Sequence, residues 1–371
     1  MIAFLAARSV GPAQRCQKAS ELDRDFADPC LAEGANPELR NNSCQTNLGT
    51  KKGLERMRVA ILDDFHRAYE ETAGVRRLRE RTEVEIYTDP FGDPAVLRGF
   101  DAIVATRERT KFDRRLLEQL PDLRIIAQTG NHAYHVDLAA SEQRGIIVAK
   151  ATGGFCTSAG ELSFGLMMAV MRQIPSVDRA IKHGGWPTPM THVLRGKTIG
   201  IVGFGNIGKY VAKIADAFGM RVFAWGSRLD PETAASAGAE WRELDDLLSS
   251  SDVVSIHATL SPQSRGLIDA RRLRLMKPTA YLINTARGPI VDEASLCAAL
   301  GSSQIAGAGL DVFDQEPLPP THPLRKLPNV VLTSHLGWPT DEMYAQFADA
   351  AADVLLGHLD GQEVPRFVAD H

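Results

Sequence analysis

The sequence predicts an α/β protein with two domains, each built on a parallel β-sheet. A chain of 371 residues is too long for one typical domain of about 150 residues. From residue 57 onward, short β-branched runs alternate with amphipathic stretches, which is the pattern of βαβ units. The alternation starts again at Lys197, so a second sheet is expected there.

Composition and charge exclude several classes of protein. Apolar residues make up 44% and charged residues 24%, as in soluble globular proteins. The net charge of −4 offers no basic surface for nucleic acid, and no apolar run is long enough to span a membrane. The opening apolar stretch is too short for a secretory signal, so we expect a cytoplasmic protein. The five cysteines lack metal-ligand spacing, so we expect free thiols and no metal site.

Residues 1–56 differ from the rest of the chain. They contain three of the five cysteines and show neither helical nor alternating periodicity. We interpret them as a poorly ordered N-terminal extension, with Met57 as a candidate for the natural start.

The first set of elements follows directly. The strands are expected at Met57–Leu62, Glu83–Tyr87, Ala102–Ala105 and Leu123–Ile126, with helices at Ala68–Glu80 and Arg114–Leu120. A buried helix at Gly160–Gln173 would connect the two sets.

The second set contains about six strands separated by helical stretches. These strands are expected at Thr198–Val202, Arg221–Ala224, Val253–His257, Tyr281–Ile283, Ile305–Ala308 and Val330–Leu332. The amphipathic stretch Asp341–Leu359 is expected to fold back on the first domain.

A glycine-rich motif lies between the first strand and the first helix of the second set. The residues are Gly203, Gly205 and Gly208, with Asn206 and Ile207 inside the motif. Gly203 permits a tight turn, Gly205 lets a pyrophosphate approach the backbone, and Gly208 lets the helix pack on the strand. The alternative is a tight turn without a ligand.

The end of the next strand bears on which dinucleotide binds. An NAD site usually has an acidic residue there, but this chain has Ser227 and Arg228 after Gly226. A serine and an arginine suit the 2′-phosphate of NADP(H), which is therefore favoured. In the alternative, Arg228 is merely solvated, Asp230 takes the role of the acid, and the cofactor is NAD(H).

Three further segments follow predicted strand ends: Asn284–Glu293, Gly309–Pro317 and Thr333–Gly337. With Gly130 and the glycine motif, in this order, they resemble the D-isomer-specific 2-hydroxyacid dehydrogenases, which include glyoxylate/hydroxypyruvate reductases and phosphoglycerate dehydrogenases. The resemblance covers residues 57–371. It implies two Rossmann/flavodoxin-like domains with the active site in the cleft between them: a substrate domain of residues 57–158 and 340–371, and a dinucleotide domain of residues 159–339. It also implies a homodimer formed through the dinucleotide domain.

Reduction of a 2-keto acid to a D-2-hydroxy acid needs a cation near the carbonyl and carboxylate, and an acid that titrates near neutral pH. Arg287 is the candidate cation and His335 the candidate acid and base. By resemblance, Glu316 stabilises the protonated His335, and the backbone N–H groups of Gly130 and Asn131 hold the substrate carboxylate. In the alternatives, Arg287 is a structural ion-pair residue, Glu316 is solvated and His335 caps a strand.

Further cofactor contacts are expected from the same resemblance, at His257, Thr285, Ala286, Asp311 and Gly337. Asp311 would bind the nicotinamide carboxamide, unless it only caps a strand end. The contact of His257 is left open, because the proline that usually follows it is absent from Ala258–Leu260.

Other functions share this fold. Formate dehydrogenases have glutamine at the position of Glu316, so formate is disfavoured. Phosphite dehydrogenase and a corepressor-like dinucleotide-sensing binding protein are the alternatives. Either Trp186 or Trp338 could shape a substrate pocket, and the sequence does not select among 2-keto acids.

Overall fold

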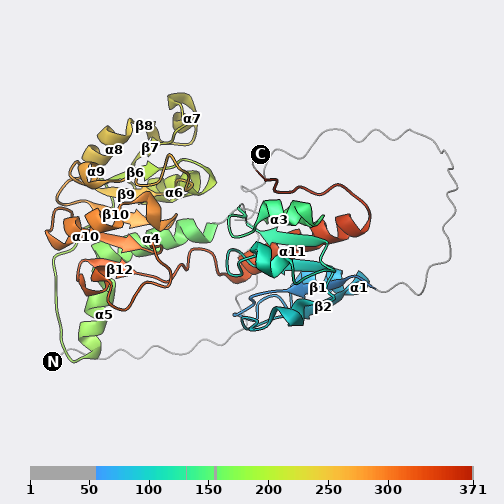
Figure 1. The fold of residues 1–371 in the computed structure, drawn as a ribbon. Coiled ribbons are helices and arrows are strands. Elements are labelled where there is room, and N and C mark those ends of the chain that lie inside the picture. The colour runs from blue at the N-terminus through green and yellow to red at the C-terminus, as the bar shows by residue number, and fades with distance from the viewer. Residues whose placement is uncertain (1–55, 131, 154–156, 370–371) are drawn as a thin grey trace, which may run out of the picture. The chain divides into compact units, whose positions relative to one another are not determined.

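The computed structural model describes residues 56–130, 132–153 and 157–369. It contains two β-sheets, and the paired strands in both are parallel, which confirms the predicted fold class (Figure 1). The predicted N-terminal extension lies outside the described residues, apart from Arg56. No helix among the described residues is long and apolar enough to cross a membrane.

The first sheet has five strands in the order β2-β1-β3-β4-β5. They are β1 (Arg58–Ile61), β2 (Glu83–Ile86), β3 (Ala102–Ala105), β4 (Ile125–Thr129) and β5 (Ile147–Ala151). This is the flavodoxin-like order, in which ligands bind beyond the carboxyl ends of the strands. Helices α1 (Ala73–Arg81), α2 (Arg114–Leu117) and α3 (Leu138–Gln143) and the 3₁₀ helix η1 (Pro94–Leu97) belong to the same part of the chain.

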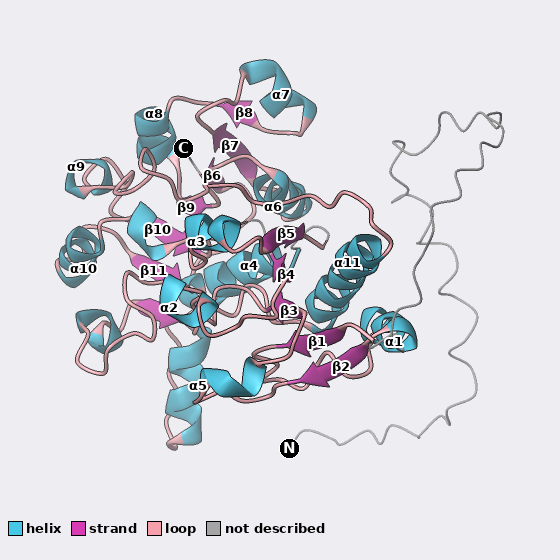
Figure 2. Ribbon diagram, turned by 45° about the vertical axis from the view of Figure 1, so that its right-hand side comes forward, coloured by secondary structure: helices cyan, strands magenta, loops and turns pink. Residues whose placement is uncertain are grey.

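The last helix, α11 (Asp341–Leu359), packs against this first sheet, as expected (Figure 2). Phe347 and Ala351 share one buried cluster with Val75 and Leu78 of α1. The two helices approach closely because α1 has Gly74, where a Cβ would collide with the backbone of Ala348.

The second sheet has seven strands in the order β12-β11-β10-β9-β6-β7-β8. They are β6 (Thr198–Val202), β7 (Arg221–Trp225), β8 (Glu240–Trp241), β9 (Val253–Ile256), β10 (Tyr281–Asn284), β11 (Gly307–Leu310) and β12 (Val330–Leu332). This is the Rossmann order with one added strand. The strand order reverses between β6 and β9, where ligands bind in such folds.

The second part of the chain also contains helices, several of which pack against this sheet. They are α4 (Thr157–Met171), α5 (Ile174–Lys182), α6 (Asn206–Ala217), α7 (Pro231–Ser236), α8 (Leu244–Ser250), α9 (Ala270–Leu273) and α10 (Glu293–Gly301), with the 3₁₀ helices η2 (Gly288–Ile290) and η3 (Pro323–Lys326). The predicted buried helix is α4, whose Phe164, Leu166 and Met167 lie in the core. The domain boundaries at residues 158/159 and 339/340 stay predictions.

Among the strands, the structure differs most from the sequence-based prediction at four. β5 and β8 were not predicted, and β4 and β11 each begin two residues later than expected. The prediction placed β11 too early because Gly307 and Gly309 are poor strand formers, although both lie inside the observed strand. A Cβ at Gly309 would press on Leu166 of α4, so glycine allows this helix to approach the sheet.

Candidate active site

The glycine-rich turn connects β6 to α6 and leaves a helix N-terminus open. Gly203 has φ +98°, and a Cβ there would collide with the backbone of Ala258. A Cβ at Gly208 would collide with the carbonyl oxygen of Gly203, whereas one at Gly205 would meet nothing within 4 Å. Gly205 is the N-cap of α6 and provides no side-chain cap, so backbone N–H groups remain available to a phosphate. The turn fits a dinucleotide pyrophosphate.

The loop after β7 exposes the two side chains expected to face a ribose. Ser227 and Arg228 are both exposed, and no carboxylate of the described residues pairs with Arg228. Asp230 has another role: its two oxygens accept hydrogen bonds from the N–H and hydroxyl of Thr233, at 2.7 and 2.8 Å, and cap α7. These hydrogen bonds lower the pKa of Asp230.

The loop after β10 fixes the position of Arg287. The side chain of Asn284 donates to the carbonyl of Arg287 and accepts from the N–H of Ala286, both at 3.0 Å. The hydroxyl of Thr285 is hydrogen-bonded to Ser163 of α4 at 2.7 Å. One guanidinium nitrogen of Arg287 donates to the carbonyl of Ala286 at 2.7 Å, and the other approaches residues of the first sheet.

His335 and Glu316 form a directly hydrogen-bonded pair. His335 Nδ1 lies 2.7 Å from Glu316 Oε2, while Glu316 Oε1 accepts the N–H of Phe313 at 3.0 Å. Burial tends to raise the pKa of Glu316, but the hydrogen bond and charge of His335, with smaller effects from Phe313 and Arg287, lower it overall. His335 has φ +58°, a strained conformation of the kind that often marks functional positions.

Asp311 orients the loop that contains His335. One carboxylate oxygen accepts from Thr333 Oγ1 at 2.5 Å and from the N–H of Leu336 at 2.7 Å. The other accepts from the N–H of Gly337 at 2.9 Å, and the residue is fully buried. Burial raises the pKa of Asp311, against these hydrogen bonds. Both oxygens are thus used inside the protein, which fits the strand-end cap at least as well as the predicted nicotinamide contact.

His257 lies just after β9, beside the glycine turn. Its Nε2 is 2.8 Å from the hydroxyl of Ser255, and burial lowers the pKa of His257 to about 4. The imidazole is therefore neutral near pH 7.

A charged cluster from the loops after β3 and β4 meets Arg287, and the sequence interpretation did not identify its members Arg107 and Glu108. Glu108 Oε1 is 3.7 Å from an Arg287 nitrogen, and the same nitrogen is 3.2 Å from His132 Nε2. His132 Nε2 is 3.4 Å from Glu108 Oε2. The local signal for Glu108 was a run of charges, Arg107-Glu108-Arg109, just after a buried strand, whereas His132 directly follows the predicted substrate residue Asn131 in the sequence. Gly130 lies beside this cluster with φ +99°, and the predicted substrate residue Asn131 is outside the described residues.

Arg287 and His335 influence the same two carboxylates, those of Glu316 and Glu108. The charges of both residues lower the pKa of Glu316, and both also lower that of Glu108. Charge interactions weaken with distance, so the guanidinium and the imidazole both lie near these two carboxylates. The roles assigned to these side chains stay predictions.

Known proteins resemble this chain over most of its length. Residues 164–337 match the family model described as D-isomer specific 2-hydroxyacid dehydrogenase, NAD binding domain. The glyoxylate reductase of Thermofilum pendens is 41% identical over 309 residues, which is 80% of this chain and 91% of that protein. This chain belongs to the D-isomer specific 2-hydroxyacid dehydrogenase family. It is therefore an oxidoreductase with a domain for a nicotinamide dinucleotide.

Two further comparisons agree with this membership of the dehydrogenase family. The glyoxylate reductase of Thermococcus litoralis is 37% identical over 80% of this chain and 93% of its own length. A crystal structure from Ralstonia solanacearum, assigned as a D-3-phosphoglycerate dehydrogenase, superimposes with a TM-score of 0.76 at 33% identity. That match covers 83% of this chain and 95% of the other.

The two tryptophans of interest in this dehydrogenase have different environments. Trp338 is buried against Tyr344 and Phe347, with ring centroids 5.5 and 6.2 Å apart, and Arg109 lies over its ring at 4.8 Å. Trp186 is 83% exposed. Trp338 is therefore mainly a core residue of the first sheet.

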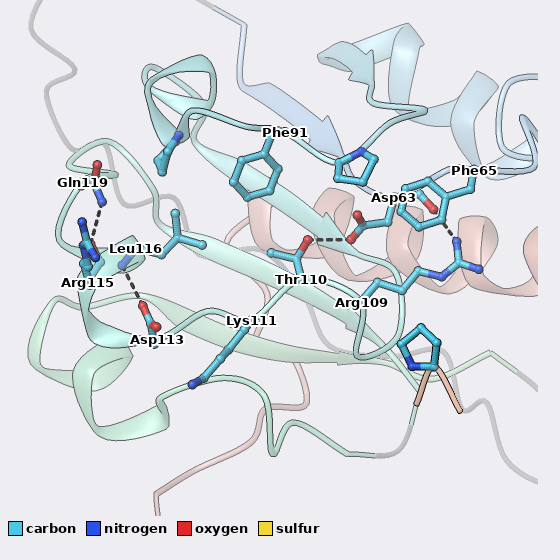
Figure 3. A pocket seen from close by; sticks show the side chains of 13 residues that line it. Asp63, Phe65, Phe91, Arg109, Thr110, Lys111, Asp113, Arg115, Leu116 and Gln119 are labelled. Carbon is cyan, nitrogen blue, oxygen red and sulfur yellow. Dashed lines mark hydrogen bonds between the residues drawn. The ribbon is translucent and has the colours of Figure 1, made fainter. Parts of the chain in front are cut away.

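A cavity of about 770 Å³ lies at the carboxyl edge of the first sheet (Figure 3). Its lining includes Asp63, Arg109, Thr110 and Pro317. Thr110 donates to Asp63 at 2.7 Å. None of the three predicted catalytic side chains lines this cavity, although Pro317 follows Glu316 in the chain.

Proposed function

We propose that this dehydrogenase reduces small 2-keto acids to D-2-hydroxy acids, with NADP(H) as the preferred cofactor. The observation that carries the proposal is the His335–Glu316 hydrogen bond of 2.7 Å. The charge of Arg287 also lowers the pKa of Glu316 in this pair. An acid and a cation in one neighbourhood are what reduction of a keto acid requires.

In this proposal each group has one task. Arg287 binds the substrate carboxylate and polarises the keto oxygen, and the loop at Gly130 holds the carboxylate from the other side. A bound reduced nicotinamide supplies the hydride. His335 donates the proton from Nε2, because Nδ1 is hydrogen-bonded to Glu316, and it accepts the proton in the reverse reaction. Glu316 fixes the ring and stabilises its protonated form.

The preference for NADP(H) is supported by the loop after β7. Ser227 and Arg228 are exposed where a 2′-phosphate is expected, and Asp230 is used as the helix cap. The remaining proposed cofactor contacts come from the glycine turn and from loops at the same edge of the sheet: Gly203, Gly205, Asn206, Ile207, Gly208, His257, Thr285, Ala286, Asp311 and Gly337.

A homodimer is part of the proposal. Helix α5 has no buried residue, and Ile174 and Ile181 are exposed on it. The following loop exposes Trp186 and Met190, at 83% and 92%. An apolar surface of this kind on the dinucleotide domain is typical of a subunit interface.

An absorbance assay of cofactor oxidation tests the reaction. It would use NADPH and NADH with glyoxylate, hydroxypyruvate, pyruvate, 2-ketoisocaproate and phenylpyruvate. We expect turnover of the smaller acids and a higher kcat/KM with NADPH. Absence of turnover with every acid would contradict the proposed reaction, and a higher kcat/KM with NADH would contradict the cofactor preference.

A further inference from the structure

Glu108 is held at the end of β3 by an unusual backbone conformation. The residue before it, Arg107, has φ +57°, which non-glycine residues rarely adopt. Two buried side chains of β4 secure this turn: Thr129 Oγ1 accepts the N–H of Arg107 at 2.9 Å, and Gln128 donates to its carbonyl at 3.1 Å. Strain that is secured in this way is typical of functional positions.

The Glu108 carboxylate is surrounded by cations. Its Oε1 is 3.7 Å from Arg287, and its Oε2 is 3.5 Å from Arg107 Nε. Among the described residues, no hydrogen bond satisfies Oε2, which is buried. Burial alone would raise the pKa of Glu108, but Arg107, His132 and Arg287 bring it to about 2, so it is ionised at any ordinary assay pH.

The cluster around Glu108 also contains Arg107, His132 and Arg287. The charges of these four side chains sum to one positive charge. Arg107 and Arg287 contribute two, and Glu108 removes one. His132 contributes none near pH 7, because burial and the two arginines lower its pKa to about 4. His335 and Glu316 form a separate pair that neutralises itself when the imidazole is protonated.

We propose that Glu108 is a specificity-determining residue, which restricts this site to keto acids with a single negative charge. The inference rests on the proposed function, since it assumes that Arg287 binds the substrate carboxylate. One carboxylate neutralises the remaining positive charge of the cluster. A second carboxylate or a phosphate on the same substrate finds no free cation there and lies close to Glu108.

The physical basis is the low polarity of a partly buried site. A like charge within about 4–6 Å strongly disfavours an ion, and water screens little in such a place. Without the charge of Glu108, the cluster would have two positive charges and could accept a dianion.

The test compares two acids of nearly equal shape, oxaloacetate and 2-ketoisocaproate, which differ in a terminal carboxylate or isopropyl group. The ratio of their kcat/KM values cancels any general effect on Arg287. We expect Glu108→Gln to raise the oxaloacetate to 2-ketoisocaproate ratio at least tenfold. Where one acid is not reduced, its inhibition constant against glyoxylate replaces kcat/KM.

Two variants serve as controls. Glu108→Asp keeps the charge and should keep the ratio near that of the wild type, which a purely structural role would not require. Glu118→Gln makes the same chemical change at the exposed C-cap of α2 and should leave the ratio unchanged.

The outcomes separate the two proposals. If the wild type reduces glyoxylate and Glu108→Gln leaves the ratio within twofold, the inference about Glu108 is wrong and the proposed function stands. If Glu108→Asp changes the ratio as much as Glu108→Gln does, charge is not the cause, and the inference is again wrong. If no keto acid is reduced, the proposed function fails, and the inference fails with it.

Discussion

The carboxyl edges of the two sheets hold their acidic side chains in different ways. In the seven-stranded sheet, Asp311 and Glu316 accept hydrogen bonds from backbone N–H groups and from one neighbouring side chain each. After β3 of the five-stranded sheet, Glu108 contacts two arginines at 3.5–3.7 Å, and its Oε2 has no hydrogen bond among the described residues. The first arrangement fixes orientation, as proton transfer requires, whereas the second mainly sets the local charge.

The largest expected effect comes from removing the guanidinium of Arg287, which contacts Glu108 and also lowers the pKa of Glu316. Arg287→Ala should lower kcat/KM for glyoxylate by about 10⁴-fold or more, because it removes both carboxylate binding and carbonyl polarisation. Arg274→Ala, at an exposed position of the same domain, should have no effect. A loss below tenfold in Arg287→Ala would show that the reacting group binds elsewhere.

A smaller effect is expected for the carboxylate that supports the imidazole. Glu316→Gln should lower kcat about 10- to 100-fold and shift the pH profile of reduction toward acid, since the protonated His335 is less stabilised. The exposed Glu232 provides the control variant Glu232→Gln. An unchanged pH profile in Glu316→Gln would remove the role assigned to this residue.

The fold and one edge of the site could be predicted because their signals are local. The observed bounds equal the predicted ones for four elements: β3, β6, β12 and α11. Their signals, β-branched runs and amphipathic periodicity, depend only on residues that are close together in the sequence. The glycine motif is equally local. Glu108 was not identified because Arg107-Glu108-Arg109 is indistinguishable from a solvated charged loop. Its significance comes from Arg287, which is distant along the chain.

Asp311 shows a second limit of the sequence. A strand-end aspartate is visible as such, but the sequence does not tell whether its carboxylate faces a ligand or the backbone. The structure shows both oxygens bonded to the loop of His335. The sequence predicts that Asp311 lies at a strand end, but not which way its carboxylate points.

The dinucleotide edge provides a third prediction, of moderate size. Arg228→Gln should lower kcat/KM with NADPH about tenfold and leave the value with NADH nearly unchanged, because the guanidinium would pair only with a 2′-phosphate. Arg221→Gln changes an exposed arginine at the opposite end of β7 and should alter neither value. Equal losses with both cofactors would contradict this role for Arg228.

The smallest expected effect concerns stability at acid pH. Burial lowers the pKa of folded His257 to about 4, while an unfolded histidine titrates near ~6.5. The unfolded state therefore binds the proton first as pH falls, and stability is lost between these values. His257→Gln should remove about 2 kcal/mol of the destabilisation between pH 7 and pH 5.

Thermal unfolding of the cofactor-free protein at the two pH values measures this effect. His183→Gln, at an exposed histidine, should leave the pH dependence unchanged. An equal pH dependence in the wild type and His257→Gln would show that His257 is not buried as a neutral group.

A crystal structure with NADP⁺ and the substrate analogue oxamate tests the central claim most directly. The account predicts that the oxamate carboxylate contacts the Arg287 guanidinium, and that its amide carbonyl lies within hydrogen-bond distance of His335 Nε2. Oxamate bound in the cavity of Figure 3, out of contact with both Arg287 and His335, would contradict it.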